Sequence, residues 1–142
     1  GEVRGAEAGA MFEAMQSGAG TLSTTHSHSA SSTMDRLASR VAQGGVLSVE
    51  EAYRQIAHNL HLLIHMVLED DTWRGGLRRR YVQEVRLVTG AVENGRPVTH
   101  LVYRVPTAST PGIFDPPAEL LAELAPFLDA PQRPRVTEER RR

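Results

Sequence analysis

Side chains of types that can do chemistry stand near the start of the sequence. Glu2 and Arg4 occur in Gly-Glu-Val-Arg, and His26 follows Thr24 and Thr25. Imidazole can donate a hydrogen bond to a phosphate oxygen and changes charge near neutral pH, and a guanidinium can pair with a carboxylate or reach a phosphate. The structural alternatives are Glu2 as an acid at a helix start, Arg4 as a solvated residue, and His26 as a strand-end residue capped by serines.

Three further histidines, His58, His61 and His65, are spaced i, i+3 and i+7. On one continuous helix they would share a side, near the geometry of metal ligands. No glutamate accompanies them in the H-E-x-x-H pattern, and the apolar run from Leu62 to Leu68 fits a buried strand as well as a helix. Because a strand would scatter the histidines, the sequence favours their having no shared metal.

Arginines form two runs, Arg78–Arg80 and Arg140–Arg142. Such runs can touch the phosphates of nucleic acid or lipid. Here no aromatic residue interrupts either run, and acidic residues stand nearby in the sequence. We therefore expect solvated segments and no nucleic-acid partner.

Composition excludes several classes of chemistry. The 142 residues carry 16 basic side chains, all arginine, against 17 acidic ones, for a net charge of -1. Without lysine, neither a G-x-x-x-x-G-K-[ST] phosphate loop nor a Schiff-base site can be complete within this chain. Without cysteine, disulfides, thiolate zinc sites and cysteine nucleophiles are excluded. The length fits one modest domain with a tail, and no apolar run approaches the roughly 20 residues of a membrane-spanning helix.

The spacing of apolar residues predicts the elements that position these side chains. The first part of the chain is expected to hold a helix over 6–16, a strand over 21–26, a polar loop over 27–32, a helix over 33–43 and a third helix after Ser48. Ser32 with Asp35 resembles a capping box for the second helix, and Ser48 with Glu51 forms a clearer one for the third.

The second part of the chain predicts a hairpin and a tail. A charged connecting loop over 69–80 leads to two strands, with Tyr81, Val85 and Leu87 on one face of the first. Asn94-Gly95 between the strands is the strongest short hairpin signal. Beyond residue 105 the chain is rich in proline, with an amphipathic stretch over 120–127 that Pro126 should shorten or kink. The residues from 131 to 142 are expected to be disordered.

The early motifs, in this order, resemble those of the type II and type IV secretion ATPases, most closely the branch that powers Flp/Tad-type pilus assembly. In that family a strand ends in G-E-[VI]-R, a helix ends in A-M-x-[ST]-G, and a strand leads to a T-x-H histidine box. The matching residues are Gly1–Arg4, Ala14–Gly18 and Thr24–His26. Similar residues follow later at 35–37, 54–57, 84–85 and 90, so the resemblance extends to Arg104.

This resemblance implies an α/β fold. Residues 1–105 would be the carboxy-terminal part of a RecA-like P-loop NTPase domain that closes with a β-hairpin, and residues 106–142 a tail rich in proline and arginine. By the same resemblance Glu2 is the Walker B acid that holds Mg²⁺, and His26 senses the terminal phosphate of ATP. Arg4 and Thr25 would contact the nucleotide, while His28 has no matching role.

The implied function is that of an ATPase in a hexameric ring, at the cytoplasmic face of the inner membrane, that acts on a membrane-embedded platform protein. The family's phosphate-binding loop, acidic box and amino-terminal domain would precede Gly1. The chain is then a fragment, and we expect it not to hydrolyse ATP by itself. The alternative is a non-catalytic α/β interaction module, or a degenerate paralogue that joins such a ring.

Overall fold

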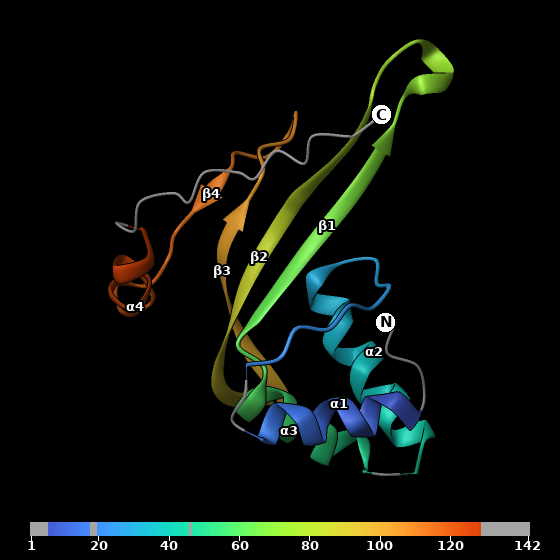
Figure 1. The fold of residues 1–142 in the computed structure, drawn as a ribbon, viewed down its shortest axis with the longest axis vertical. Coiled ribbons are helices and arrows are strands. Elements are labelled where there is room, and N and C mark those ends of the chain that lie inside the picture. The colour runs from blue at the N-terminus through green and yellow to red at the C-terminus, as the bar shows by residue number, and fades with distance from the viewer. Residues whose placement is uncertain (1–5, 18–19, 46, 129–142) are drawn as a thin grey trace, which may run out of the picture.

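A computed structural model describes residues 6–17, 20–45 and 47–128. Three helices precede a four-stranded sheet, and a fourth helix follows it (Figure 1). In chain order the elements are α1 (Ala6–Gln16), α2 (Ala30–Gln43), α3 (Val49–Asn59), β1 (Leu62–Asp70), the short 3-10 helix η1 (Thr72–Arg74), β2 (Arg78–Glu93), β3 (Arg96–Arg104), β4 (Ile113–Phe114) and α4 (Ala118–Leu128).

The sheet follows the order of the chain, β1-β2-β3-β4, and every pairing in it is antiparallel. The predicted hairpin at Asn94-Gly95 is confirmed as the turn between β2 and β3. Both turn residues have positive φ, 49° and 75°, as a two-residue turn matched to the strand twist requires. The fold is thus mixed α/β, which agrees with the expected class at that level.

A hydrophobic core joins the first three helices to one face of the sheet. Ile56 of α3 and Val41 of α2 are its largest fully buried side chains. Leu63 and Val88 supply the sheet side of the core, and Phe12 supplies that of α1. Figure 1 shows these helices gathered at one end of the sheet, while the hairpin of β1 and β2 projects beyond them at the other end.

Helix α1 occupies the predicted residues, and α3 is capped as predicted, since the Ser48 side chain accepts from the Glu51 N–H. Helix α2 begins three residues earlier than predicted, at Ala30. The cap is Ser29 and not Ser32: the Ser29 side chain accepts from the Ser32 N–H, and the Ser32 hydroxyl accepts from the Ser29 N–H, both at 3.1 Å. This reciprocal serine pair satisfies backbone donors that a later start would leave open.

The strand predicted over 21–26 is wrong as a regular strand. Of these residues only Thr24 forms a β bridge, and the rest have no regular secondary structure. The apolar residue of the segment, Leu22, is exposed. With no apolar side chain to bury, the segment gains little from joining a sheet.

The ambiguous run after α3 is a strand. Helix α3 ends at Asn59, and β1 begins at Leu62. The loop predicted over 69–80 is wrong at both ends, because β1 continues to Asp70 and β2 begins at Arg78. The charges that suggested a loop neutralise each other across the strands, where Arg78 pairs with Asp70 at 3.0 Å and Arg79 with Glu69 at 3.2 Å.

A bulge interrupts the pairing of β1 with β2 between His65 and Met66. Tyr81 pairs with Val67, and Val85 pairs with Ile64. Because Ile64 and Val67 are three residues apart on one strand, their partners lie on opposite faces. The expectation that Tyr81 and Val85 share a face is therefore wrong.

The last described residues form β4 and α4. The two-residue strand β4 was not predicted from the sequence, while the amphipathic stretch near 120–127 lies in α4 as a helix that includes Pro126. The arginine-rich tail expected over 131–142 lies outside the described residues.

Candidate functional site

In the sequence, two of the candidate residues precede α1 and two follow it. Glu2 and Arg4 lie outside the described residues, so their predicted roles with Mg²⁺ and phosphate stay predictions. Thr25 and His26 are described, on the segment without regular structure that precedes α2. His26 is exposed, and Thr25 is half-buried.

A hydrogen bond to α2 fixes the position of Thr25. The Nη1 atom of Arg40, near the end of α2, donates to the Thr25 hydroxyl oxygen at 3.1 Å. This contact joins residues 15 apart in the chain and fastens the segment beside His26 to the last turn of the helix. The Thr25 side chain, next to His26, is thus bonded to a side chain from a helix packed in the core.

A network of serines holds the residues that follow His26. The Ser27 hydroxyl donates to the Ser29 carbonyl at 3.1 Å and lies 2.8 Å from the Ser32 hydroxyl. Together with the Ser29 cap, these bonds bring the chain into α2 along a defined path. His26 therefore stands four residues before the first residue of a helix, whose amino-terminal end favours negative charge.

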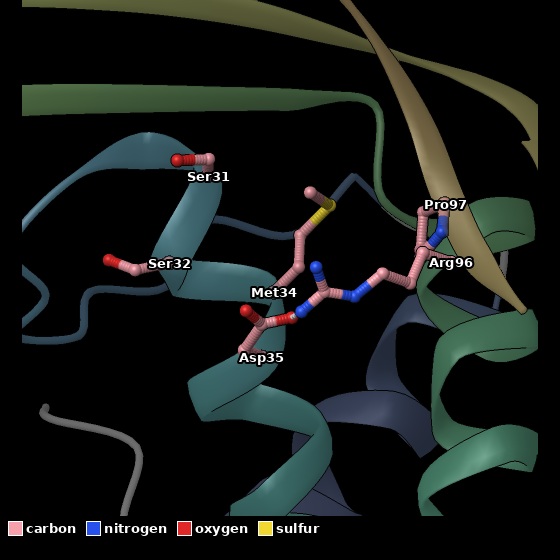
Figure 2. A pocket seen from close by; sticks show the side chains of 6 residues that line it. All are labelled: Ser31, Ser32, Met34, Asp35, Arg96 and Pro97. Carbon is pink, nitrogen blue, oxygen red and sulfur yellow. Dashed lines mark hydrogen bonds and ion pairs between the residues drawn. The ribbon is translucent and has the colours of Figure 1, made fainter. Parts of the chain in front are cut away.

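A hollow of about 250 Å³ lies between the first turns of α2 and the start of β3 (Figure 2). Figure 2 shows the side chains of Asp35 and Arg96 reaching toward each other across it. Arg96 Nη2 lies 2.5 Å from Asp35 Oδ1. The remaining lining residues are Ser31, Ser32, Met34 and Pro97.

Tyr53 of α3 completes this group. Its hydroxyl donates to Asp35 Oδ1 at 2.7 Å, and the Arg96 guanidinium carbon lies 5.9 Å from the centre of its ring. Burial, followed by the hydrogen bond to Asp35, raises the pKa of Tyr53 above its ordinary value. Hydrogen bonding with Tyr53 and then with Asp35 raises the pKa of Arg96. The pair Asp35–Arg96 is already neutral, so the hollow offers no unpaired cation from Arg96 to an anion.

No local pattern in the sequence indicated the Asp35–Tyr53–Arg96 group. Asp35 is 18 residues from Tyr53 and 61 residues from Arg96. The three meet only because α2 and α3 pack together beside the β2–β3 turn. A covarying pair in an alignment is the kind of signal that would have found them.

The three later histidines are not brought together. His58 lies on α3, His61 in the connection and His65 on β1, so the strand separates them. In the described part of the chain, no three His, Asp or Glu side chains are placed to hold a metal ion.

Comparison with known proteins adds no relative. No protein-family model matches the chain, and no curated protein sequence matches it. Among the described residues, no helix combines the length and the apolar character needed to cross a bilayer. The resemblance to secretion ATPases therefore depends on the residues and their order alone.

Proposed function

We propose that this chain is the carboxy-terminal half of a RecA-like ATPase domain from a type II/IV secretion ATPase of the Flp/Tad pilus-assembly branch. The observation that carries the proposal is the order of three motifs along the chain, with α1 between the first motif and the histidine. The structure supports it in one respect, since α1 spans the helix that the family pattern requires. The strand that the pattern places before the histidine is reduced to a single β bridge at Thr24.

The residues near His26 suit a phosphate group. The His26 imidazole and the Thr25 hydroxyl are both groups that can donate a hydrogen bond to a phosphate oxygen. In the proposed site Thr25 and Arg4 contact phosphate oxygens, His26 donates to the terminal phosphate, and Glu2 holds Mg²⁺. Bound Mg²⁺ would offset the charge that develops on the phosphate during hydrolysis.

The proposed setting follows the resemblance. The intact protein would form a hexameric ring at the cytoplasmic face of the inner membrane and act on a platform protein of the secretion or pilus machine. The tether from Arg40 to Thr25 gives the His26 segment a firm connection to α2. A change at the phosphate would then be transmitted to a helix of the core and not to a free loop.

The experiment is magnesium-dependent ATP hydrolysis by the product of the complete reading frame that contains this chain. Glu2→Gln is expected to lower kcat at least about 100-fold, because a bound metal supplies several kcal/mol of charge stabilisation. Binding of a fluorescent ATP analogue should persist in the variant, which separates lost chemistry from lost folding. Unchanged kcat in Glu2→Gln would contradict the assignment of Glu2.

The isolated 142-residue chain provides the complementary test. It lacks the lysine that a phosphate-binding loop needs, so we expect no magnesium-dependent turnover above that of buffer. Turnover by the purified chain that Glu2→Ala abolishes would contradict this expectation.

A non-catalytic interaction module is the second candidate, and one observation favours it. The sheet face opposite the helices exposes several apolar side chains, including Ile64, Met66 and Phe114, as interaction surfaces do. The same ATPase measurement separates the two. A complete protein that assembles but shows no magnesium-dependent turnover would support the module and reject the motor.

A further inference from the structure

An apolar row crosses the open face of the sheet from edge to edge. It consists of one residue from each strand, paired in sequence as Ile64 with Val85, Val85 with Tyr103, and Tyr103 with Phe114. Directly paired residues share a face. Leu63, the neighbour of Ile64, packs into the core with the helices, so the row faces the opposite side.

The two ends of this row are uncovered in the described part of the chain, while its middle residues, Val85 and Tyr103, are half-buried. Ile64 is 55% exposed and Phe114 is 77% exposed. Along β1 the same face continues through Leu62, Met66 and Leu68, all exposed. A contiguous apolar surface of this kind marks a place where another element binds.

Helix α4 carries a matching apolar side. Its leucines and phenylalanine fall at helical spacing, at Leu120, Leu121, Leu124 and Phe127. The last three are exposed, and Phe127 is 75% exposed. In Figure 1 α4 lies beyond β4, away from the other helices. Only the residues 115–117 separate it from Phe114, the last member of the row.

The apolar side chains of α4 are spaced along the helix as the strands are spaced across the sheet. Neighbouring strands lie about 4.8 Å apart, so β3, β2 and β1 are about 5, 10 and 14 Å from β4. A helix rises about 1.5 Å per residue, which puts Leu121, Leu124 and Phe127 about 4.5, 9 and 13.5 Å beyond Ala118. A helix laid across the face from β4 toward β1 therefore sets these three side chains over Tyr103, Val85 and Ile64 in turn.

We propose that α4 is a strap that closes over this sheet face within the same chain. Asp115 is held to β3, because its N–H donates to the Val102 carbonyl at 2.8 Å. Closure therefore occurs by a change of ψ at Pro116 and Pro117, whose φ is fixed by the ring. A connection of three residues keeps α4 at a high effective concentration beside its own sheet, which favours closure within one chain over exchange with a second copy. Any protein that binds the same face must then displace α4. This inference does not depend on nucleotide binding.

The absence of cysteine allows a direct test by disulfide cross-linking in the full chain. Ile64→Cys is combined with Phe127→Cys in one protein and with Ala125→Cys in the matched control. Ala125 points about 200° away from Phe127 around the helix. All three sites are exposed, so the variants are expected to fold, which their circular dichroism spectra check.

On mild oxidation, closure predicts a monomer with an internal disulfide for the Phe127→Cys protein, seen as the loss of two hydrogens in its mass. The Ala125→Cys control should form that bond at least about tenfold more slowly, since its thiol faces away. Equal rates in the two proteins, or no internal bond in the first, would overturn the proposal. Disulfide-linked dimers in place of monomers would overturn it in favour of a second copy as the occupant.

Discussion

The guanidinium of Arg96 lies 2.5 Å from the carboxylate of Asp35 and thereby fastens the turn between β2 and β3 to helix α2. The Tyr53 hydroxyl donates to the same carboxylate oxygen, so α3 joins the connection. Helix α2 also holds Thr25 through Arg40. Helix α2 thus contacts both the His26 segment and the turn between β2 and β3.

Tyr53→Phe should lower the free energy of unfolding by about 1 kcal/mol, the usual net value of a hydrogen bond. The aromatic ring stays in place below Arg96, so the loss reports the hydroxyl alone. Urea unfolding measures the change. Tyr103→Phe is the control, because the structure shows no hydrogen bond from that hydroxyl to other described residues, and an equal loss there would contradict the account.

The pKa of Tyr53 also predicts how the stability of the protein depends on pH in the alkaline range. Folding raises the pKa of Tyr53 above its ordinary value of 10.0, so the folded state keeps the proton after the unfolded chain has lost it. The stability from this group is complete below the unfolded pKa and is lost as the pH rises through the folded one. Between about pH 8 and about pH 11, the wild-type protein should lose more stability than Tyr53→Phe. Parallel losses would refute this.

The hydrogen bonds of Asp70 predict that the stability of the protein falls at acidic pH. The Thr72 hydroxyl donates to Asp70 Oδ1 at 2.6 Å and the Thr72 N–H at 3.1 Å, and these bonds lower the pKa of Asp70 below its ordinary value of 3.8. Stability from this carboxylate is present above the unfolded pKa and is lost as the pH falls through the folded one.

Thr72→Val should therefore raise the pKa of Asp70 toward 3.8, as followed by NMR titration of its carboxyl carbon. Thr107→Val serves as the control, because the Thr107 hydroxyl bonds to Thr110 and not to Asp70, and it should leave the titration unchanged. An Asp70 titration that does not move in Thr72→Val would show that the hydroxyl has no effect on the carboxylate.

Substitution of Ile56 tests how much the hydrophobic core contributes to the free energy of unfolding. Its side chain is fully buried among α2, α3 and the sheet, so Ile56→Ala should cost about 3 kcal/mol of unfolding free energy. Leu77→Ala, an exposed site at the end of the projecting hairpin, should cost less than about 0.5 kcal/mol. Similar costs at the two sites would mean that the helices do not pack on the sheet as described.

Local signals account for the parts of the fold that were predicted. Ser48 and Glu51 start α3 within one turn, and Asn94-Gly95 provides the positive φ values of its own turn. The hairpin of β1 and β2 was missed because its stability depends on pairs across the strands, such as Arg78 with Asp70. In the sequence alone those charges look like a solvated loop.

The candidate site likewise has residues that a local motif predicted and contacts that only the fold creates. Thr25 and His26 were found as a short motif, whereas the contact of Arg40 with Thr25 depends on the path of α2 back along the segment. The group of Asp35, Tyr53 and Arg96 requires three elements to pack together. Spacing rules cover neighbours on one helix or strand and do not reach such contacts.

The measurement that tests the central claim most directly is single-turnover ATP hydrolysis by the complete protein with His26→Ala, beside His28→Ala as the matched control. Both histidines are exposed on the same segment, so His28→Ala controls for the loss of an exposed imidazole close to the site. The account predicts a loss of about 100-fold for His26→Ala, the scale of one preorganised donor to a developing charge, and no change for His28→Ala. Equal rates for the two variants and the wild-type protein would contradict it.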